Sequence, residues 1–119
     1  MYDNQNIFAK IIKGKIPAEK VYEDEKVLAF KDINPQAPIH ILVIPKKEII
    51  SFHDFMEKCS PDEVVHFFQK VRDIAEKEGL QADGYRLISN HGPHAGQEVP
   101  HFHVHILGGK RLGRLVSAA

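Results

Sequence analysis

The chain has 119 residues, and its 16 Lys and Arg residues balance its 16 Asp and Glu residues. This length predicts a single domain spanning 1–119, and without a net positive charge we expect no binding to nucleic acid or to membrane surfaces. The single cysteine excludes an intramolecular disulfide. The N-terminal segment lacks a signal-peptide profile, and no apolar run reaches the ~20 residues of a spanning helix, which favours a cytoplasmic protein.

The first half of the chain predicts a short helix followed by three strands. Ile7, Ile11 and Ile12 share one helical face. Asn6 is a candidate N-cap for this helix, and Gly14 is a candidate stop. Strands are expected at Lys20–Glu23, Val27–Ile33 and His40–Ile44, and a turn with two prolines separates the last two.

The second half predicts the long helix and two further strands. Ser60 is a candidate N-cap, Pro61 fits the first helical position, and Glu63 completes a capping box. An apolar stripe at helical spacing follows, and Gly79 is a stop signal. One helical turn is expected within Ile49–Met56, and strands are expected at Tyr85–Asn90 and His101–Leu107. The order of elements indicates an α+β fold with a five-stranded, mostly antiparallel sheet, one long helix and one short helix.

Three of the eight histidines fall within one predicted strand. Alternate side chains of a strand point to opposite faces, about 6.5–7 Å apart along each face. One face carries the apolar residues Phe102, Val104 and Ile106. The other face carries His101, His103 and His105. The segment therefore presents a core face and a row of imidazoles.

Two kinds of chemistry use such a row. Neutral imidazoles ligate zinc, but ligands must converge on one point, and three same-face residues of one strand fan out. A neutral imidazole is also a nucleophile that can form a covalent intermediate at phosphorus. The preceding loop, NHGPHAGQEVP, contains Gly92 and Gly96, which allow backbone N–H groups to approach phosphate oxygens. This loop favours phosphorus chemistry.

The segment HFHVHIL, 101–107, matches the pattern His-x-His-x-His followed by apolar residues. This pattern is the signature of the histidine triad superfamily. Its context, GQEVPHFHVHILGG, and the segment IFAKIIKGKIPAEKVYEDEKVLAFKDINPQAPIHILVIPKK, 7–47, resemble the branch of histidine triad nucleotide-binding proteins. The resemblance covers a core of about 6–113 and leaves a short C-terminal tail, 110–119.

The resemblance implies a histidine triad fold whose five-stranded antiparallel sheet extends across a homodimer. It implies binding of purine nucleoside monophosphates and hydrolysis of phosphoramidates such as adenosine 5′-phosphoramidate. The middle histidine, His103, would attack the α-phosphorus and form a nucleotidyl-histidine intermediate. His105 would hydrogen-bond the phosphate, and its backbone carbonyl would hold the proton on the other nitrogen of His103. His101 would join His40 in a network behind the nucleophile.

The resemblance also implies a nucleotide pocket. Asp32 would accept the ribose hydroxyls, although a strand-end turn residue is an alternative interpretation, and Phe30 would pack on the base. The other apolar contacts of base and sugar would be Ile7, Phe8, Ile33 and Leu42, which are otherwise ordinary core residues. The contacts of the α-phosphate and leaving group would be Asn90, Gly96, Gln97, Glu98 and Val99.

Three departures from the family pattern qualify these expectations. Many bacterial relatives have a cysteine near Phe8 and Ala9 that helps to hold a structural zinc, so no such zinc and no cofactor are expected here. Glu98 stands where animal members have a serine that assists the leaving group. The tail also differs from that of animal members.

Alternative functions remain open from the sequence. A dinucleoside polyphosphate hydrolase would use the same row of histidines with a larger leaving group. A nucleotide-binding regulatory module would show little turnover, but binding alone needs no nucleophile. A zinc hydrolase would lose its activity to a chelator.

Overall fold

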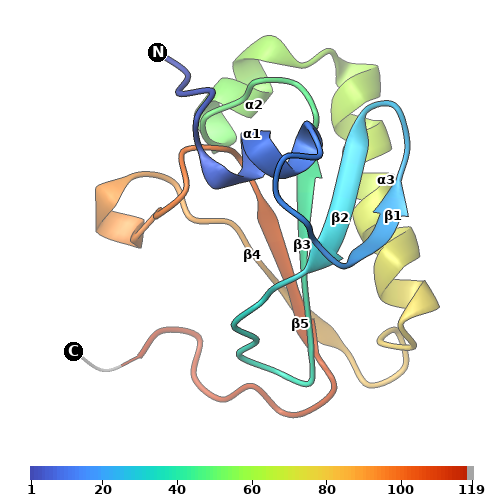
Figure 1. The fold of residues 1–119 in the computed structure, drawn as a ribbon. Helices are drawn as coiled ribbons and strands as arrows, with labels where there is room; N and C mark the ends of the chain where they lie inside the picture. Colours follow the sequence, from blue (N-terminus) through green and yellow to red (C-terminus); the bar gives the residue numbers. More distant parts are fainter. Residues whose placement is uncertain (118–119) are drawn as a thin grey trace.

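Five strands form one antiparallel sheet in the order β1-β2-β3-β5-β4 in the computed structural model, which describes residues 1–117 (Figure 1). The strands are β1 (Lys20–Glu23), β2 (Val27–Lys31), β3 (Ile39–Pro45), β4 (Tyr85–Ile88) and β5 (Val104–Gly108). The helices are α1 (Ile7–Ile12), α2 (Phe52–Lys58) and α3 (Pro61–Lys77), and a 3-10 helix spans Pro93–Ala95. The predicted α+β fold with a five-stranded antiparallel sheet is confirmed.

Both predicted helix starts form as the sequence indicates. The Asn6 side chain accepts a hydrogen bond from the amide of Ala9 at the start of α1. Ser60 and Glu63 form the capping box of α3, with Pro61 in its first turn. Where one helical turn was expected, α2 is a complete second short helix that packs Phe55 into the core.

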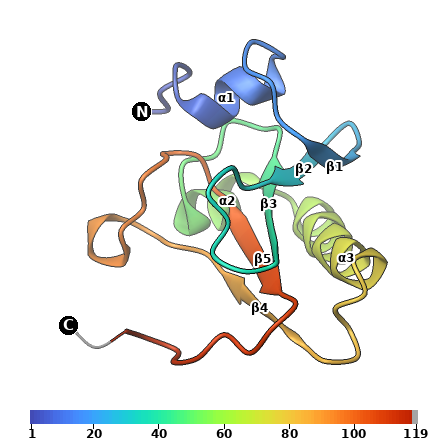
Figure 2. The same cartoon turned by 60° about the horizontal axis from the view of Figure 1, so that its bottom comes forward.

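The sheet separates two apolar clusters, with α3 and α1 on opposite sides (Figure 2). On the α3 side, Val43 pairs with Val104 and Ile41 pairs with Ile106 across β3 and β5. This face packs on the apolar stripe of α3, which buries Phe67, Val71, Ile74 and Ala75. On the other side, Phe8 and Ile11 of α1 pack on Leu28, Phe30, Leu42 and Ile44.

The strand predicted for 101–107 begins three residues later than expected. The amide of His101 bonds to the carbonyl of Val99, and that of Phe102 bonds to the carbonyl of Ile49. The backbone of 101–103 therefore pairs with neither β3 nor β4, and His101 and His103 lie in a bent segment before β5. The side chains still alternate, because Phe102 is buried in the α3-side core.

The C-terminal segment leaves β5 and contacts β4 through the side chain of Arg86. The Arg86 guanidinium donates to the carbonyls of Gly113 and Arg114, and residues 110–117 form no helix or strand. The last two residues of the predicted tail, 118 and 119, lie outside the described residues. Across residues 1–117, no helix has both the length and the apolar character needed to cross a membrane.

Candidate active site

His103 is held so that one ring nitrogen remains available for chemistry. Its Nδ1–H donates to the backbone carbonyl of His101 over 2.7 Å. The proton on Nδ1 leaves the lone pair on Nε2. The side chain lines a cavity, and burial lowers its pKa below the ordinary value of 6.5. At neutral pH His103 is therefore an uncharged imidazole with a free Nε2.

The carbonyl that orients His103 differs from the one expected. His101 supplies it, whereas the sequence pointed to His105. The reason is the bend at 101–103, which turns the His101 carbonyl back toward the ring two residues along. In a regular strand this carbonyl would point sideways to a neighbouring strand.

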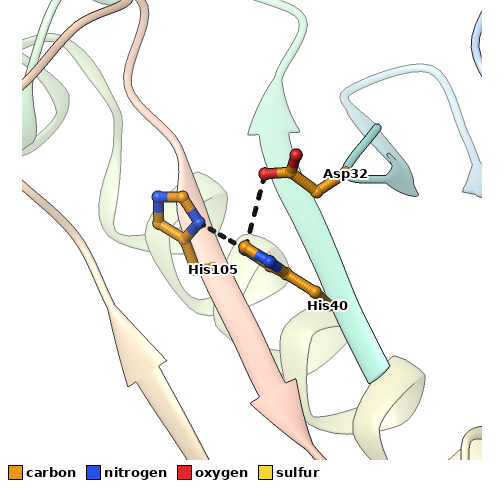
Figure 3. A group of neighbouring side chains, drawn as sticks. All are labelled: Asp32, His40 and His105. Atoms are coloured by element: carbon orange, nitrogen blue, oxygen red, sulfur yellow. Dashed lines mark hydrogen bonds and ion pairs between the residues drawn. The ribbon is translucent and has the colours of Figure 1, made fainter. Parts of the chain in front are cut away.

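His105 forms a hydrogen bond with His40, and His40 also lies beside the Asp32 carboxylate (Figure 3). The amide of Gln36 donates to Nδ1 of His40 over 3.0 Å, so the proton of His40 sits on Nε2. This Nε2 lies 2.9 Å from Nδ1 of His105 and 3.5 Å from Asp32 Oδ2. Because Nδ1 of His105 accepts, its Nε2 carries a proton and acts as a donor.

Strand register brings these side chains together. Phe30 pairs with Leu42, and Leu42 pairs with His105, so the three lie in one row across β2, β3 and β5. His40 precedes Leu42 by two residues on β3 and therefore lies on the same face. Burial lowers the pKa of His105 to about 4 and lowers that of His40, although Asp32 opposes both shifts. Both rings are neutral at pH 7.

His101 lies behind the cavity and does not line it. Its ring is fully buried, with Nε2–H donating to the carbonyl of Pro45 over 2.7 Å. Its Nδ1 accepts from the hydroxyl of Tyr2 over 2.6 Å. The expected network of His101 with His40 does not form: the ring of His101 bonds to Tyr2 and Pro45, and His40 bonds to His105. Burial lowers the pKa of His101 to about 4.

A cavity of about 530 Å³ opens beside His103 and His105. Most of the side chains predicted for the site line it: Ile7, Phe8, Phe30, Asp32, Ile33, His40, Leu42, Asn90, Gly96, Glu98, Val99, His103 and His105. Sequence reasoning missed several others: Ile11, Ile16, Pro17, Ala18, Lys31, Asn34 and Gln36. Ile11 continues the apolar face of α1, which is the signal that could have found it. Ile16, Pro17 and Ala18 lie in the loop between α1 and β1, where no helical period applies.

The cavity has two chemically different ends. The aromatic rings of Phe8 and Phe30 meet edge to face at 5.6 Å between centroids and form an apolar end. Asn90, Gly96 and Glu98 come from the loop between β4 and β5 and form a polar end. The ring of Phe8 also contacts that of His103, at 5.0 Å between centroids, so His103 adjoins the aromatic pair. This arrangement suits a molecule with an apolar ring system, a phosphoryl centre and a polar leaving group.

Gln97 holds the loop and does not line the cavity. Its Nε2 donates to the carbonyls of Ile50 and Val99, and its Oε1 accepts from the amide of Gly92. Gly92 and Gly96 both have positive φ, of 76° and 75°, which side chains disfavour. The Gln97 side chain thus supports the loop that carries Asn90 and Gly96, and its contact with the phosphate stays a prediction.

Asp32, His40 and His105 bring three ligand atoms within 4.8 Å of one another, a spacing that a metal ion can use. A histidine ligand usually donates from its second nitrogen to a carbonyl or carboxylate. Nδ1 of His40 instead accepts from the Gln36 amide, so a metal on Nε2 would require a ring without any proton. This donor set does not fit a metal ion.

A family model described as the HIT domain, where HIT stands for histidine triad, matches residues 13–112 of the chain. The chain belongs to the HIT family. The resemblance seen in the sequence is thereby confirmed.

Similar proteins from several bacteria support this membership. A HIT-like protein of Rickettsia prowazekii is 56% identical over 117 residues, which cover 98% of each chain. The purine nucleoside phosphoramidase of Escherichia coli K12 is 45% identical over 113 residues, covering 95% of this chain and 94% of that protein. The HIT family hydrolase of Legionella pneumophila has a solved structure that superposes with a TM-score of 0.83 at 42% identity, covering 92% of this chain and 96% of that one. This HIT protein is a nucleotide hydrolase of the histidine triad type.

Proposed function

We propose that the protein hydrolyses the P–N bond of purine nucleoside 5′-phosphoramidates, with His103 as the nucleophile. The observation that carries this proposal is the free Nε2 of His103 in the cavity, whose opposite nitrogen donates to the carbonyl of His101. The similarity to a purine nucleoside phosphoramidase supports the choice of substrate.

In the first step, Nε2 of His103 attacks the α-phosphorus and the P–N bond breaks. The amine leaves with the electron pair of that bond and with a proton that its nitrogen has taken from solvent. The Nε2–H of His105 donates to a phosphoryl oxygen and offsets the charge that develops there. The bond from His103 Nδ1–H to His101 persists, so the phosphorylated ring is a cation.

In the second step, water attacks the phosphorus of this intermediate. A cationic imidazole is a good leaving group, because the P–N electron pair returns to a ring that then becomes neutral. The water supplies the new oxygen, one proton is released, and the nucleoside monophosphate leaves. The carbonyl of His101 thus serves both steps: it aims the lone pair of the free ring and stabilises the charged ring.

The nucleoside would lie at the apolar end of the cavity. Phe8, Phe30 and Leu42 offer a surface for a base, and the Asp32 carboxylate offers oxygens to the ribose hydroxyls. Oδ1 of Asp32 accepts from the amide of Asn34 at 2.8 Å, which fixes the carboxylate at the cavity edge. The leaving group would then lie at the polar end.

The test is release of AMP from adenosine 5′-phosphoramidate by purified protein, with and without a chelator. We expect turnover in both conditions, and we expect His103→Ala to lower kcat by about 1,000-fold or more. Calorimetry should show that this variant binds AMP within about threefold of the wild-type affinity, because one imidazole among many contacts is lost. Mass spectrometry of quenched wild-type reactions should find the nucleotidyl adduct on His103. Wild-type turnover by His103→Ala would refute the assignment.

A further inference from the structure

Tyr2 contacts the site from the segment that precedes α1, and the mechanism above gives it no role. Its hydroxyl lies 2.6 Å from Nδ1 of His101. The two rings meet edge to face, with centroids 5.6 Å apart and planes at 73°. Tyr2 is therefore both hydrogen-bonded to His101 and packed against it.

His101 depends on this hydroxyl to satisfy its second nitrogen. Because Nε2–H donates to the carbonyl of Pro45, Nδ1 carries a lone pair inside a fully buried ring. Among residues 1–117, the Tyr2 hydroxyl is the partner of this nitrogen. A buried acceptor without a donor is costly, so loss of the hydroxyl would favour a rotated ring or an entering water. Tyr2 and Pro45 thus fix the ring from its two ends.

His101 also connects Tyr2 to His103, the proposed nucleophile. The carbonyl of His101 accepts the Nδ1–H of His103, and this bond leaves Nε2 of His103 free. The ring and the carbonyl of His101 share one backbone unit in the bent segment before β5. A change in the ring position therefore moves the carbonyl that aims His103.

Tyr2 is itself placed by a local turn. The Asn6 amide and side-chain amide both donate to the carbonyl of Asp3, and the Gln5 amide donates to the Asp3 side chain. Asn6 is buried and caps α1, which carries Phe8. The ring of Phe8 contacts both His101 and His103, at 6.3 Å and 5.0 Å between centroids. The turn thus ties Tyr2 to the helix that packs on the histidines.

We propose that Tyr2 is a positioning residue, whose hydrogen bond to His101 holds the carbonyl that orients the nucleophilic ring of His103. This inference rests on the proposed function. Tyr2 acts through His101 and does not touch the bound substrate, so its loss should lower kcat while leaving nucleotide binding intact.

The test compares Tyr2→Phe with a matched control, Tyr22→Phe. The Tyr22 hydroxyl also donates a 2.6 Å bond, to Asp24, and Tyr22 does not line the cavity. With adenosine 5′-phosphoramidate, Tyr2→Phe should lower kcat by about fivefold to tenfold, and its AMP affinity should stay within about twofold. Tyr22→Phe should keep wild-type kcat even if its thermal stability falls. Equal kcat in Tyr2→Phe and wild type, or equal losses in both variants, would overturn the proposal.

A second measurement needs no turnover. ¹⁵N-resolved NMR of the ligand-free protein reports which ring nitrogen carries each proton and how fast that proton exchanges with water. We expect the Nδ1–H of His103 to exchange about tenfold faster in Tyr2→Phe than in wild type and Tyr22→Phe. Unchanged His101 and His103 ring signals would overturn the proposal. If the wild type fails to cleave phosphoramidates but these signals change, the proposed function is wrong and the hydrogen-bond relay is supported.

Discussion

His103 differs from the other histidines of the site in the partner of its Nδ1, which donates to a carbonyl, whereas Nδ1 of His40, His101 and His105 accepts a hydrogen bond. Backbone groups determine which nitrogen of each ring carries the proton. The carbonyl of His101 holds the proton of His103 on Nδ1. The amide of Gln36 keeps the proton of His40 on Nε2, and His40 in turn donates to Nδ1 of His105. The result is one ring with a free lone pair beside one ring with a free N–H, and their centroids are 5.1 Å apart. Two uncharged imidazoles, one able to act as a nucleophile and one able to donate a hydrogen bond, thus lie side by side.

Glu98 brings a negative charge to the polar end of the cavity. Its exposed side chain lines the cavity, and it forms no ion pair or hydrogen bond within 1–117. We expect Glu98→Gln to lower kcat/KM by about fivefold for phosphoramidates whose leaving amine carries a second positive charge, and to raise it for leaving groups with a carboxylate. Steady-state kinetics on a matched substrate pair checks this.

The exposed Glu25 lies outside this cavity and provides the control, since Glu25→Gln should leave both substrates unaffected. Equal effects of Glu98→Gln on both substrates would contradict a role of charge. The same argument applies to diadenosine polyphosphates, because their leaving group is anionic. We expect the wild-type protein to hydrolyse these substrates more slowly than Glu98→Gln does.

At the scale of elements, the period of two in 101–107 predicted correctly that Phe102, Val104 and Ile106 face the core. Of the three histidines, His103 and His105 line the cavity, whereas His101 is buried behind it. The period of two could not predict where β5 begins, because a bent segment bonded to Val99 and Ile49 has the same alternation as a paired strand. The contact of Tyr2 with His101 spans 99 positions and leaves no local pattern. The capping box of α3 was predictable, since its bonds join residues three apart.

The side chain of Gln97 supports the loop between β4 and β5. Gln97→Ala removes one hydrogen bond that connects the loop to Ile50 and two that lie within the loop, with Gly92 and Val99. We expect this variant to raise the KM for phosphoramidate by about fivefold, because Asn90 and Gly96 lose their fixed places. Gln97→Glu should raise KM by at least as much, since a carboxylate oxygen would face the two carbonyls to which Gln97 donates. The exposed Gln81 offers a control: Gln81→Ala should keep wild-type KM, and an unchanged KM in Gln97→Ala would contradict the prediction.

At the scale of the molecule, β4 is an edge strand of the sheet with exposed apolar residues. Tyr85 and Leu87 are 37% and 45% exposed and share one face. The homodimer implied by the family resemblance remains a prediction, and an unpaired edge with apolar side chains favours β4 as its interface. Light scattering should find a dimer for wild type and a monomer for Leu87→Glu. Val65→Glu, at an exposed position on α3, should remain dimeric, and a monomeric wild type would contradict the prediction.

The buried histidines also make the stability of the fold depend on pH. His101 and His105 have pKa values of about 4, against 6.5 when unfolded. Between pH 6.5 and pH 4 the unfolded chain therefore binds more protons than the folded one, and the free energy of unfolding falls as pH is lowered through this window.

Each such histidine contributes up to about 1.4 kcal/mol per pH unit. Urea unfolding at pH 7 and pH 5 measures the slope. His94→Gln, a change at an exposed histidine, is the control and should keep the wild-type slope. Equal stability of the wild type at both pH values would contradict the prediction.

The central position of β5 has a consequence for how this chain can change its length. β5 lies between β3 and β4, with Val104 and Ile106 on the α3 side and His105 on the cavity side. A one-residue insertion or deletion within the strand would exchange its two faces. The imidazole would then enter the hydrocarbon interior beneath α3, and a branched aliphatic side chain would take its place beside the ligand. Viable length variants of this protein must therefore place their indels in the connecting loops, or balance an indel within β5 by a second one of opposite sign in the same strand.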